Sequence, residues 1–176
     1  AIAVETSWTD HTCAIRDDGF LFCWGYGLWG QLGTGNNSSS STPVMVDLGP
    51  GRTAISIAMS GGSTCVILDN AALKCWGIDT YGALGIGNNI SANTPQTVNL
   101  GTARTAVAIA GIGWAGSFCA ILDDGSLKCW GYNGWGLLGI GNNSDQNTPQ
   151  FVELGTDRTA AAIFGGGVHT CAILDN

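Results

Sequence analysis

The chain has 176 residues, of which 28 are Gly and 7 are Cys, while only 11% are Asp, Glu, Lys or Arg. Because 45% of the residues are hydrophobic, the chain can form a core, and this composition excludes a disordered protein. Its formal net charge of -7 with six Lys and Arg residues argues against a nucleic-acid partner, since such binding depends on clustered cations. No apolar run approaches the ~18 residues that cross a bilayer, so we expect a soluble protein with no membrane span.

A unit of about 50 residues is repeated along the chain. Cys-Trp-Gly begins at residues 23, 75 and 129, Thr-Pro at 42, 94 and 148, and Arg-Thr-Ala at 52, 104 and 158, so successive copies lie 52 and 54 residues apart. The predicted units are 1–52, 53–104, 105–158 and an incomplete 159–176. Helical repeats are shorter, whereas four-stranded propeller blades have this period.

Each complete unit contains four segments that predict β-strands. In the second unit they span residues 53–59, 63–68, 73–77 and 95–100, each rich in Val, Ile, Leu or aromatic residues and bounded by Gly, Asn, Asp or Pro. No stretch free of Gly and Pro keeps the 3.6-residue period of a helix. We therefore predict an all-β fold in one partial domain, a β-propeller of four-stranded blades with about three and a half blades in this chain, in preference to a β-solenoid.

Six of the seven cysteines form pairs with nine residues between them and a hairpin turn at the centre of each pair. Counting outward from the turn places the two members of each pair opposite one another on antiparallel strands, within reach of a disulfide. The predicted disulfides are Cys13–Cys23, Cys65–Cys75 and Cys119–Cys129. Zinc is disfavoured because zinc ligands are usually spaced more closely and His is scarce. Disulfides indicate an oxidising compartment, which is the extracellular space, the cell surface or a lumen.

The hairpin turns carry Gly where a left-handed residue is needed, at Gly19 and Gly125. In the second unit Ala71 stands at that position, so we expect either that Asn70 carries the positive φ or that the turn differs.

The seventh cysteine, Cys171, stands at the first cysteine position of the fourth unit, just after His169-Thr170. Its partner is expected about ten residues later, by analogy with the other units. We therefore favour a chain that continues, with the remainder of its own propeller as a partner, over a reactive thiol.

The repeated unit resembles that of the regulator of chromosome condensation family, G-x-x-H-T-x-A-L-x-x-D-G-x-L-Y-x-W-G-x-N-x-x-G-Q-L-G-x-G, at residues 11–35, 63–87 and 117–141. That family forms seven-bladed propellers, and the resemblance implies that this chain is part of one. The chain departs from the pattern by carrying two cysteines per unit. It also has Asp79 and Gly27 at the loop position where Asn133 keeps the Asn, and Ser63 and Ser117 at the His position.

The resemblance implies several functions. The disulfides make the chain similar to extracellular members, so we expect a non-enzymatic propeller repeat that acts as a structural or adhesive scaffold for protein partners, other copies of itself, or glycans. The alternative is a secreted specific binder or inhibitor, like the relative that inhibits β-lactamase through aromatic loop residues. A guanine nucleotide exchange factor or a propeller lyase is less favoured, because of the charge and because no catalytic motif matches.

Candidate binding residues lie in the segments where the units differ. An aromatic residue occupies the same loop position in all three units, and such residues dominate protein interfaces and stack on sugars. They either point outward as anchors or pack on the next blade. The candidates are Trp29, Tyr81, Trp135, Tyr26 and Tyr132, with Trp114 and Trp8 as weaker ones, whereas Trp24, Trp76 and Trp130 are assigned to the core.

Other recurring residues have structural interpretations, so no catalytic residue, metal or cofactor is expected. We expect His11 and His169 to satisfy turn backbone groups, the repeated Asp residues to form hairpin turns, and Arg52, Arg104 and Arg158 to brace the blade junctions. The Gly-rich loops lack the Lys and the helix of a phosphate-binding loop. They do contain N-x-S acceptors for N-glycosylation, or are plain polar loops, at Asn36, Asn37, Asn89 and Asn142.

Overall fold

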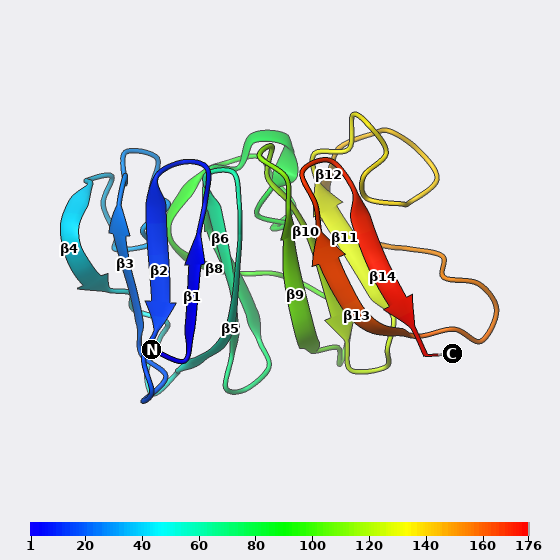
Figure 1. Ribbon diagram of the computed structural model, residues 1–176, viewed down its shortest axis with the longest axis horizontal. Helices are drawn as coiled ribbons and strands as arrows, with labels where there is room; N and C mark the ends of the chain where they lie inside the picture. The colour runs from blue at the N-terminus through cyan, green and yellow to red at the C-terminus, as the bar shows by residue number, and fades with distance from the viewer. Residues whose placement is uncertain (176) are drawn as a thin grey trace.

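The computed structural model describes residues 1–175, in which strands form four antiparallel sheets that stand side by side (Figure 1). The predicted all-β propeller of four-stranded blades is therefore confirmed, with about three and a half blades. Blade 1 contains β1 (Ala3–Thr6), β2 (His11–Ile15), β3 (Leu21–Gly25) and β4 (Ser40–Met45). Blade 2 contains β5 (Ala54–Ser60), β6 (Ser63–Leu68), β7 (Leu73–Gly77) and β8 (Ala92–Thr97). Blade 3 contains β9 (Ala106–Ile112), β10 (Ser117–Leu122), β11 (Leu127–Gly131) and β12 (Gln146–Phe151).

The last sheet is a half blade of β13 (Ala160–Gly165) and β14 (Thr170–Leu174). The predicted fourth unit, 159–176, ends at a residue that lies outside the described part of the chain. A single turn of 3-10 helix, η1 (Thr80–Gly82), adds to the strands, although the sequence predicted no helix. No helix within residues 1–175 has the length and hydropathy that a membrane crossing requires.

The first strands of consecutive blades pack side by side, while β4, β8 and β12 lie on the outside. The approach is close enough to require Gly, because a Cβ on Gly111 would overlap the carbonyl oxygen of Met59, and one on Gly165 would overlap that of Gly111. Small residues on the inner strands thus set the distance between neighbouring blades.

The bounds of two strands in the second unit differ from the prediction. The outer strand is Ala92–Thr97 and not 95–100, since it begins opposite Gly77 and a bulge lets Gln96 face Cys75. Pro95 is tolerated because the strand lies on the edge of the sheet. The inner strand is Ala54–Ser60 and not 53–59, because Ser60 still pairs with Ser63.

The three predicted disulfides are present, and their cysteines are directly paired in the strand register with Cα atoms 4.1 Å apart. Gly19 and Gly125 carry the positive φ of their turns, as predicted. In the second unit this conformation falls on Ala71, with a φ of 60°, and not on Asn70. The Oδ1 of Asn70 instead accepts the backbone N–H of Ala72 and closes the turn.

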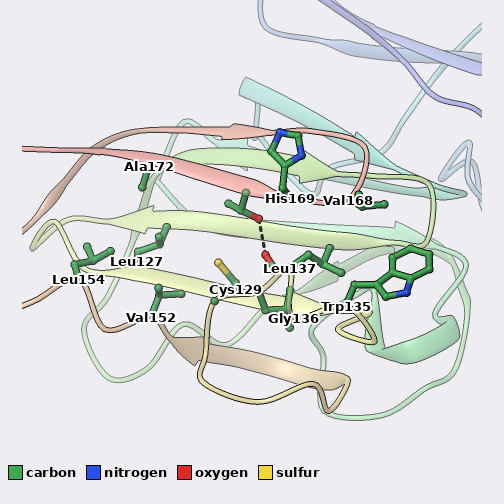
Figure 2. A pocket seen from close by; sticks show the side chains of 13 residues that line it. Leu127, Cys129, Trp135, Gly136, Leu137, Val152, Leu154, Val168, His169 and Ala172 are labelled. Carbon is green, nitrogen blue, oxygen red and sulfur yellow. Dashed lines mark hydrogen bonds between the residues drawn. The ribbon is translucent and has the colours of Figure 1, made fainter.

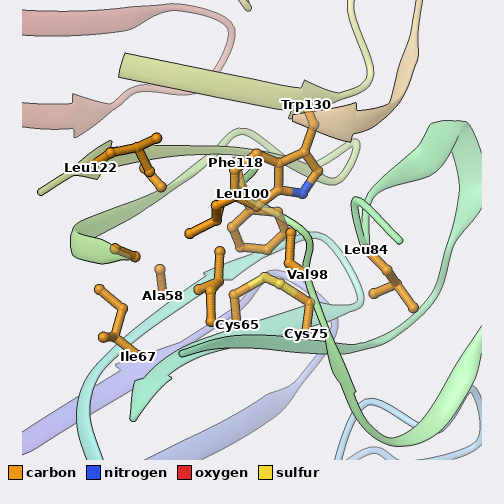
Figure 3. Packing of buried hydrophobic residues seen from close by; sticks show 13 residues of the cluster. Ala58, Cys65, Ile67, Cys75, Leu84, Val98, Leu100, Phe118, Leu122 and Trp130 are labelled. Carbon is orange, nitrogen blue, oxygen red and sulfur yellow. A yellow bond between two sulfur atoms is a disulfide. The ribbon is translucent and has the colours of Figure 1, made fainter. Parts of the chain in front are cut away.

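The core lies between blades, and each complete junction is centred on a Trp. Trp130 of blade 3 is fully buried among apolar residues of blade 2 that include Leu84 and Val98 (Figure 3). Trp76 of blade 2 is buried in the same way against blade 1. Trp24 was also predicted to lie in the core, but it is only partly buried, because within residues 1–175 no blade precedes blade 1 to receive it.

Candidate functional site on the loop face

Alternating strand directions divide the connections between two opposite faces. The loop face, at the top of Figure 1, comprises residues 7–10, 26–39, 61–62, 78–91, 113–116, 132–145 and 166–169. The turn face, at the opposite end, comprises residues 16–20, 46–53, 69–72, 98–105, 123–126 and 152–159. The long loops that vary between units all belong to the loop face, which makes it the candidate site.

The two faces differ in charge. The positive charges of the chain all lie at the turn face. The Arg residues belong to its segments. The Nζ atoms of Lys74 and Lys128 reach it from strands and donate to the carbonyls of Leu48 and Leu100, both at 2.9 Å. Arg52 pairs with Asp69 at 3.3 Å, so the segment after blade 1 is joined to the hairpin of blade 2. The loop face has no Lys or Arg, and its acids are Asp10, Asp79 and Asp145.

The predicted aromatic residues gather on the loop face in two clusters. Tyr81, Tyr132, Trp135 and Trp114 form a chain across blades 2 and 3, with successive ring centroids 5.1, 5.4 and 6.1 Å apart. Trp135 and Trp114 are each 58% exposed and Tyr81 is 46% exposed, so these rings face solvent, and the contact of Tyr81 with Tyr132 joins blade 2 to blade 3. Whether these rings act as binding anchors or as blade packing stays a prediction.

The second aromatic cluster belongs to blade 1. The rings of Tyr26 and Trp29 meet edge to face at 5.1 Å, and Trp29 is 47% exposed. Trp8 is 84% exposed on the same face. The surrounding loops are rich in Asn, Ser and Gly, so the face combines rigid rings with short amide and hydroxyl groups.

The long loop of blade 3 is held by the residue at the Asn position of the repeat. In blade 3 the Oδ1 of Asn133 accepts the Leu138 amide at 3.1 Å, and its Nδ2 donates to the carbonyls of Asn142 and Ser144 at 2.8 and 3.1 Å. This side chain bridges both ends of the loop that carries Trp135. A single buried amide thereby fixes the aromatic position.

Blade 2 has a carboxyl group in the same position. The Oδ1 of Asp79 accepts the Leu84 amide at 2.8 Å, but Oδ2 has no hydrogen-bond partner among residues 1–175. Asp79 is 1% exposed, and this burial raises its pKa to about 6, although the backbone amides of Leu84 and Ile90 oppose the shift. The sequence marks Asp79 as a departure from the repeat, but its burial was not predicted.

The buried His11 joins blades 1 and 2. Its Nδ1 lies 2.7 Å from the Ser7 hydroxyl and 3.2 Å from that of Thr9, and its Nε2 lies 2.9 Å from the Thr64 hydroxyl. The prediction that it satisfies turn backbone groups is therefore wrong, since its partners are hydroxyls. Burial lowers the pKa of His11 to about 4, so the ring is neutral at neutral pH. His169, at the equivalent position, is exposed.

The remaining predicted site residues are on the surface. The four candidate glycosylation residues, Asn36, Asn37, Asn89 and Asn142, are exposed, and their glycosylation stays a prediction. Cys171 is an exposed free thiol on β14. Among residues 1–175 no group of three or more His, Cys, Asp or Glu side chains is arranged to hold a metal ion.

Comparison with known proteins agrees with this geometry. The sequence-family model of the regulator of chromosome condensation (RCC1) repeat matches residues 18–67 and 124–173, which together make up more than half of the chain. The chain belongs to the RCC1 repeat family. It is 30% identical to the ultraviolet-B receptor UVR8 of Arabidopsis thaliana over 174 residues, which are 99% of this chain and 39% of UVR8.

The chain is similar to two further proteins. The chain is 27% identical to the human E3 ubiquitin-protein ligase HERC2 over 143 residues, 81% of this chain and 3% of HERC2. The crystal structure of Prp20p from Saccharomyces cerevisiae superposes with a TM-score of 0.84 at 18% identity, over 97% of this chain and 42% of Prp20p. The chain therefore spans about two fifths or less of the length of these relatives.

Proposed function

We propose that this chain is a non-enzymatic propeller scaffold that binds a protein partner through the aromatic clusters of its loop face. The observation that carries the proposal is the set of half-exposed rings of Trp29, Tyr81, Trp114 and Trp135 on a face without Lys or Arg. Exposed Trp and Tyr in such a setting are the usual anchors of protein interfaces.

The family and the buried histidine support a binding role. Prp20p is described as having binding properties to Gsp1p and histones, so at least one protein of this fold binds other proteins. Both ring nitrogens of His11 are engaged by hydroxyl groups inside the blade junction, which leaves neither for acid-base chemistry.

The disulfides support an oxidising location. Three buried disulfides connect the second and third strands of all complete blades, and such bonds persist in secreted, surface or lumenal proteins. We accordingly infer an extracellular or lumenal scaffold, although the family also includes a mitochondrial relative, RUG3 of Arabidopsis thaliana.

The proposal is tested by immobilising two variants of the chain and comparing which proteins each one retains from an extracellular fraction of the source. One variant replaces Trp29, Tyr81 and Trp135 by Ala on the loop face, and its matched control replaces Arg52 and Arg104 by Ala on the turn face. Each lost anchor costs about 1–2 kcal/mol, so the first variant should retain each partner at least about tenfold less than the control does. Equal retention by both variants contradicts the proposal, and retention that survives proteolysis of the fraction identifies a glycan instead of a protein.

A further inference from the structure

A pocket of about 190 Å³ opens on the loop face at the junction of blades 2 and 3. Residues of blade 2 and the 113–116 loop of blade 3 form its walls, and Thr9 of blade 1 completes them. Tyr81 and Trp114 in these walls are about half exposed, whereas Ala83 is buried. This space, the Ala83 pocket, therefore leads from solvent to the side chain of Ala83.

The small size of Ala83 is one cause of the pocket. The other units carry larger residues at the equivalent position, Gln31 and Leu137, and both are buried. Leu137 and Val168 line the same space between blade 3 and the half blade (Figure 2). The repeat equivalent of Val168 is Gly116, and a Cβ added there would lie 2.8 Å from the Ala83 methyl group. Ala83 thus faces the next blade as Leu137 does, but it leaves room for a further side chain.

The hairpin loop of blade 3 is the other cause. Two residues, 61–62, connect β5 to β6, whereas four residues, 113–116, connect β9 to β10. The longer loop brings Trp114 and Ala115 to the pocket. The pocket thus depends on residues particular to this junction and not on the architecture of the blade.

The chemistry of the walls favours an apolar group over a sugar. Within the part of the chain that the structure describes, no residue that lines the pocket has an amide, carboxyl or cationic side chain. Two of its hydroxyl groups already donate inside the protein. The Ser63 hydroxyl donates to the Ile78 carbonyl at 2.5 Å, and the Thr9 hydroxyl donates to the Gly61 carbonyl at 3.0 Å. A sugar ring buried here would leave hydroxyl groups of its own without partners, which is unfavourable.

The size of the pocket suits one aliphatic side chain. A cavity of about 150 Å³ is enough to hold benzene, so a space of about 190 Å³ accepts a group as large as the side chain of Leu. Leu137 shows that a Leu side chain is buried at the equivalent position of blade 3.

The charge of the loop face favours basic residues beside that aliphatic group. The face has no Lys or Arg, and the exposed Asp10 directly follows Thr9 of the pocket wall. Opposite charges across an interface favour association, and like charges oppose it.

We propose that the Ala83 pocket binds a Leu-sized aliphatic side chain that a partner protein presents between basic residues. The aliphatic group enters toward Ala83 and contacts the rings of Tyr81 and Trp114, and its basic neighbours face Asp10. This inference rests on the proposed function, in which the loop face binds a protein, and it adds the chemistry of the partner.

The probe is the blocked tripeptide acetyl-Lys-Leu-Lys-amide, titrated into the whole chain while the methyl NMR signals of Ala83 and Ala115 are followed. Both signals should shift to saturation, because both residues line the pocket. Acetyl-Lys-Ala-Lys-amide should bind about tenfold more weakly, since it lacks three carbon atoms that would be buried. Acetyl-Glu-Leu-Glu-amide should also bind more weakly, since its carboxylates meet Asp10.

Two variants locate the binding. Ala83→Leu should abolish the shift at Ala115 by filling the pocket from within. Its matched control is Ile90→Ala, which changes an exposed aliphatic side chain outside the pocket and should bind the Leu peptide as the wild type does. Equal affinity of the wild type for the Leu and Ala peptides, or no shift with either, would overturn the proposal, and this comparison holds even if Ala83→Leu fails to fold.

Two further outcomes separate this inference from its alternatives. Shifts caused by methyl β-glucopyranoside but not by the Leu peptide would overturn it in favour of a glycan site. If the variant that lacks Trp29, Tyr81 and Trp135 loses its protein partners but the wild type does not bind the Leu peptide, the Ala83 pocket alone is refuted. If that variant retains as many proteins as its control while the Leu peptide binds the wild type, the role of the aromatic clusters is refuted and the pocket is supported.

Discussion

Replacement of Asp79 by Asn should stabilise the protein at neutral pH. The Oδ2 atom is buried without a donor, and in blade 3 the Nδ2 of Asn133 at the equivalent position donates to two loop carbonyls. The other hydrogen bonds of Asp79 and Asn133 correspond. The Oδ1 atom of each accepts a backbone amide, from Leu84 and from Leu138. The backbone amide of each donates to a side-chain oxygen in the loop, of Ser91 for Asp79 and of Asp145 for Asn133. An Asn at residue 79 can therefore make the hydrogen bonds that Asn133 makes in blade 3.

The magnitude follows from the pKa of Asp79, which burial raises from 3.8 to about 6. A carboxyl group whose pKa is higher in the folded state stabilises the fold in its protonated form, and this contribution is lost as the pH rises through about 6. At about 1.4 kcal/mol per pKa unit, the raised pKa of Asp79 lowers the free energy of unfolding by about 3 kcal/mol at pH 7.5 and by about 1 kcal/mol at pH 4.5. Asp79→Asn removes that loss, which corresponds to a rise in Tm of about 6–12 °C at pH 7.5.

Charged groups near Asp79 do not change this expectation. The residues in contact with the Asp79 carboxyl group are neutral. The turn η1 follows Asp79 directly, and the strands that pack against this turn are β11 and β12. The one charged residue on these two strands is Lys128, whose Nζ bonds to the Leu100 carbonyl at the turn face. His11 titrates over the same range with the opposite sign, so the wild type and the variant must be compared at each pH.

The assay is thermal or urea unfolding of the wild type and Asp79→Asn at pH 7.5 and 4.5. Asn133→Asp is the matched reverse change, and it should lose about 3 kcal/mol or more at pH 7.5, since the Asp145 carboxylate already accepts the backbone amide at residue 133. An Asp79→Asn variant that is no more stable than the wild type at pH 7.5, or whose advantage does not shrink at pH 4.5, would refute the destabilising effect of the buried carboxylate.

Three further changes probe the junctions and the disulfides. Loss of one disulfide, through Cys119→Ala with Cys129→Ala, should cost about 2–3 kcal/mol in urea unfolding, because a short loop is no longer closed in the unfolded chain; an unchanged midpoint would contradict this. Trp130→Ala should lower the free energy of unfolding by about 3–5 kcal/mol, and Trp24→Ala should lower it clearly less, because the Trp24 ring is only partly buried. Equal losses would argue against a core that lies between the blades. His11→Gln should remove an acid-induced loss of about 3 kcal/mol, which the wild type shows between pH 6.5 and 4 because the unfolded chain binds the proton first; a variant as acid-sensitive as the wild type would refute this.

The repeat, the strands and the disulfides could be predicted because they depend on local sequence. A nine-residue spacing around a turn fixes which cysteines face each other, as at Cys13 and Cys23. Pro95 misled the prediction of the outer strand, because an edge strand continues on both sides of a proline. The positive φ of Ala71 was missed because propensity favours Asn at such a position.

Features that depend on two blades were harder to predict. The hydroxyl partner of the His11 Nε2 atom is Thr64, which lies 53 residues away, and no local pattern joins them. The separation of aromatic and basic residues between two faces was present in the sequence, but it becomes visible only when strand directions are followed through each unit.

Because Trp76 and Trp130 each lie against the preceding blade, neighbouring blades are coupled to one another in the part of the chain that the structure describes. Blade 2 both inserts a Trp into blade 1 and receives one from blade 3, so two interfaces must open before it unfolds. Among residues 1–175, amide hydrogen exchange should accordingly be slower in β6 and β7 than in blade 1, which shares one such interface.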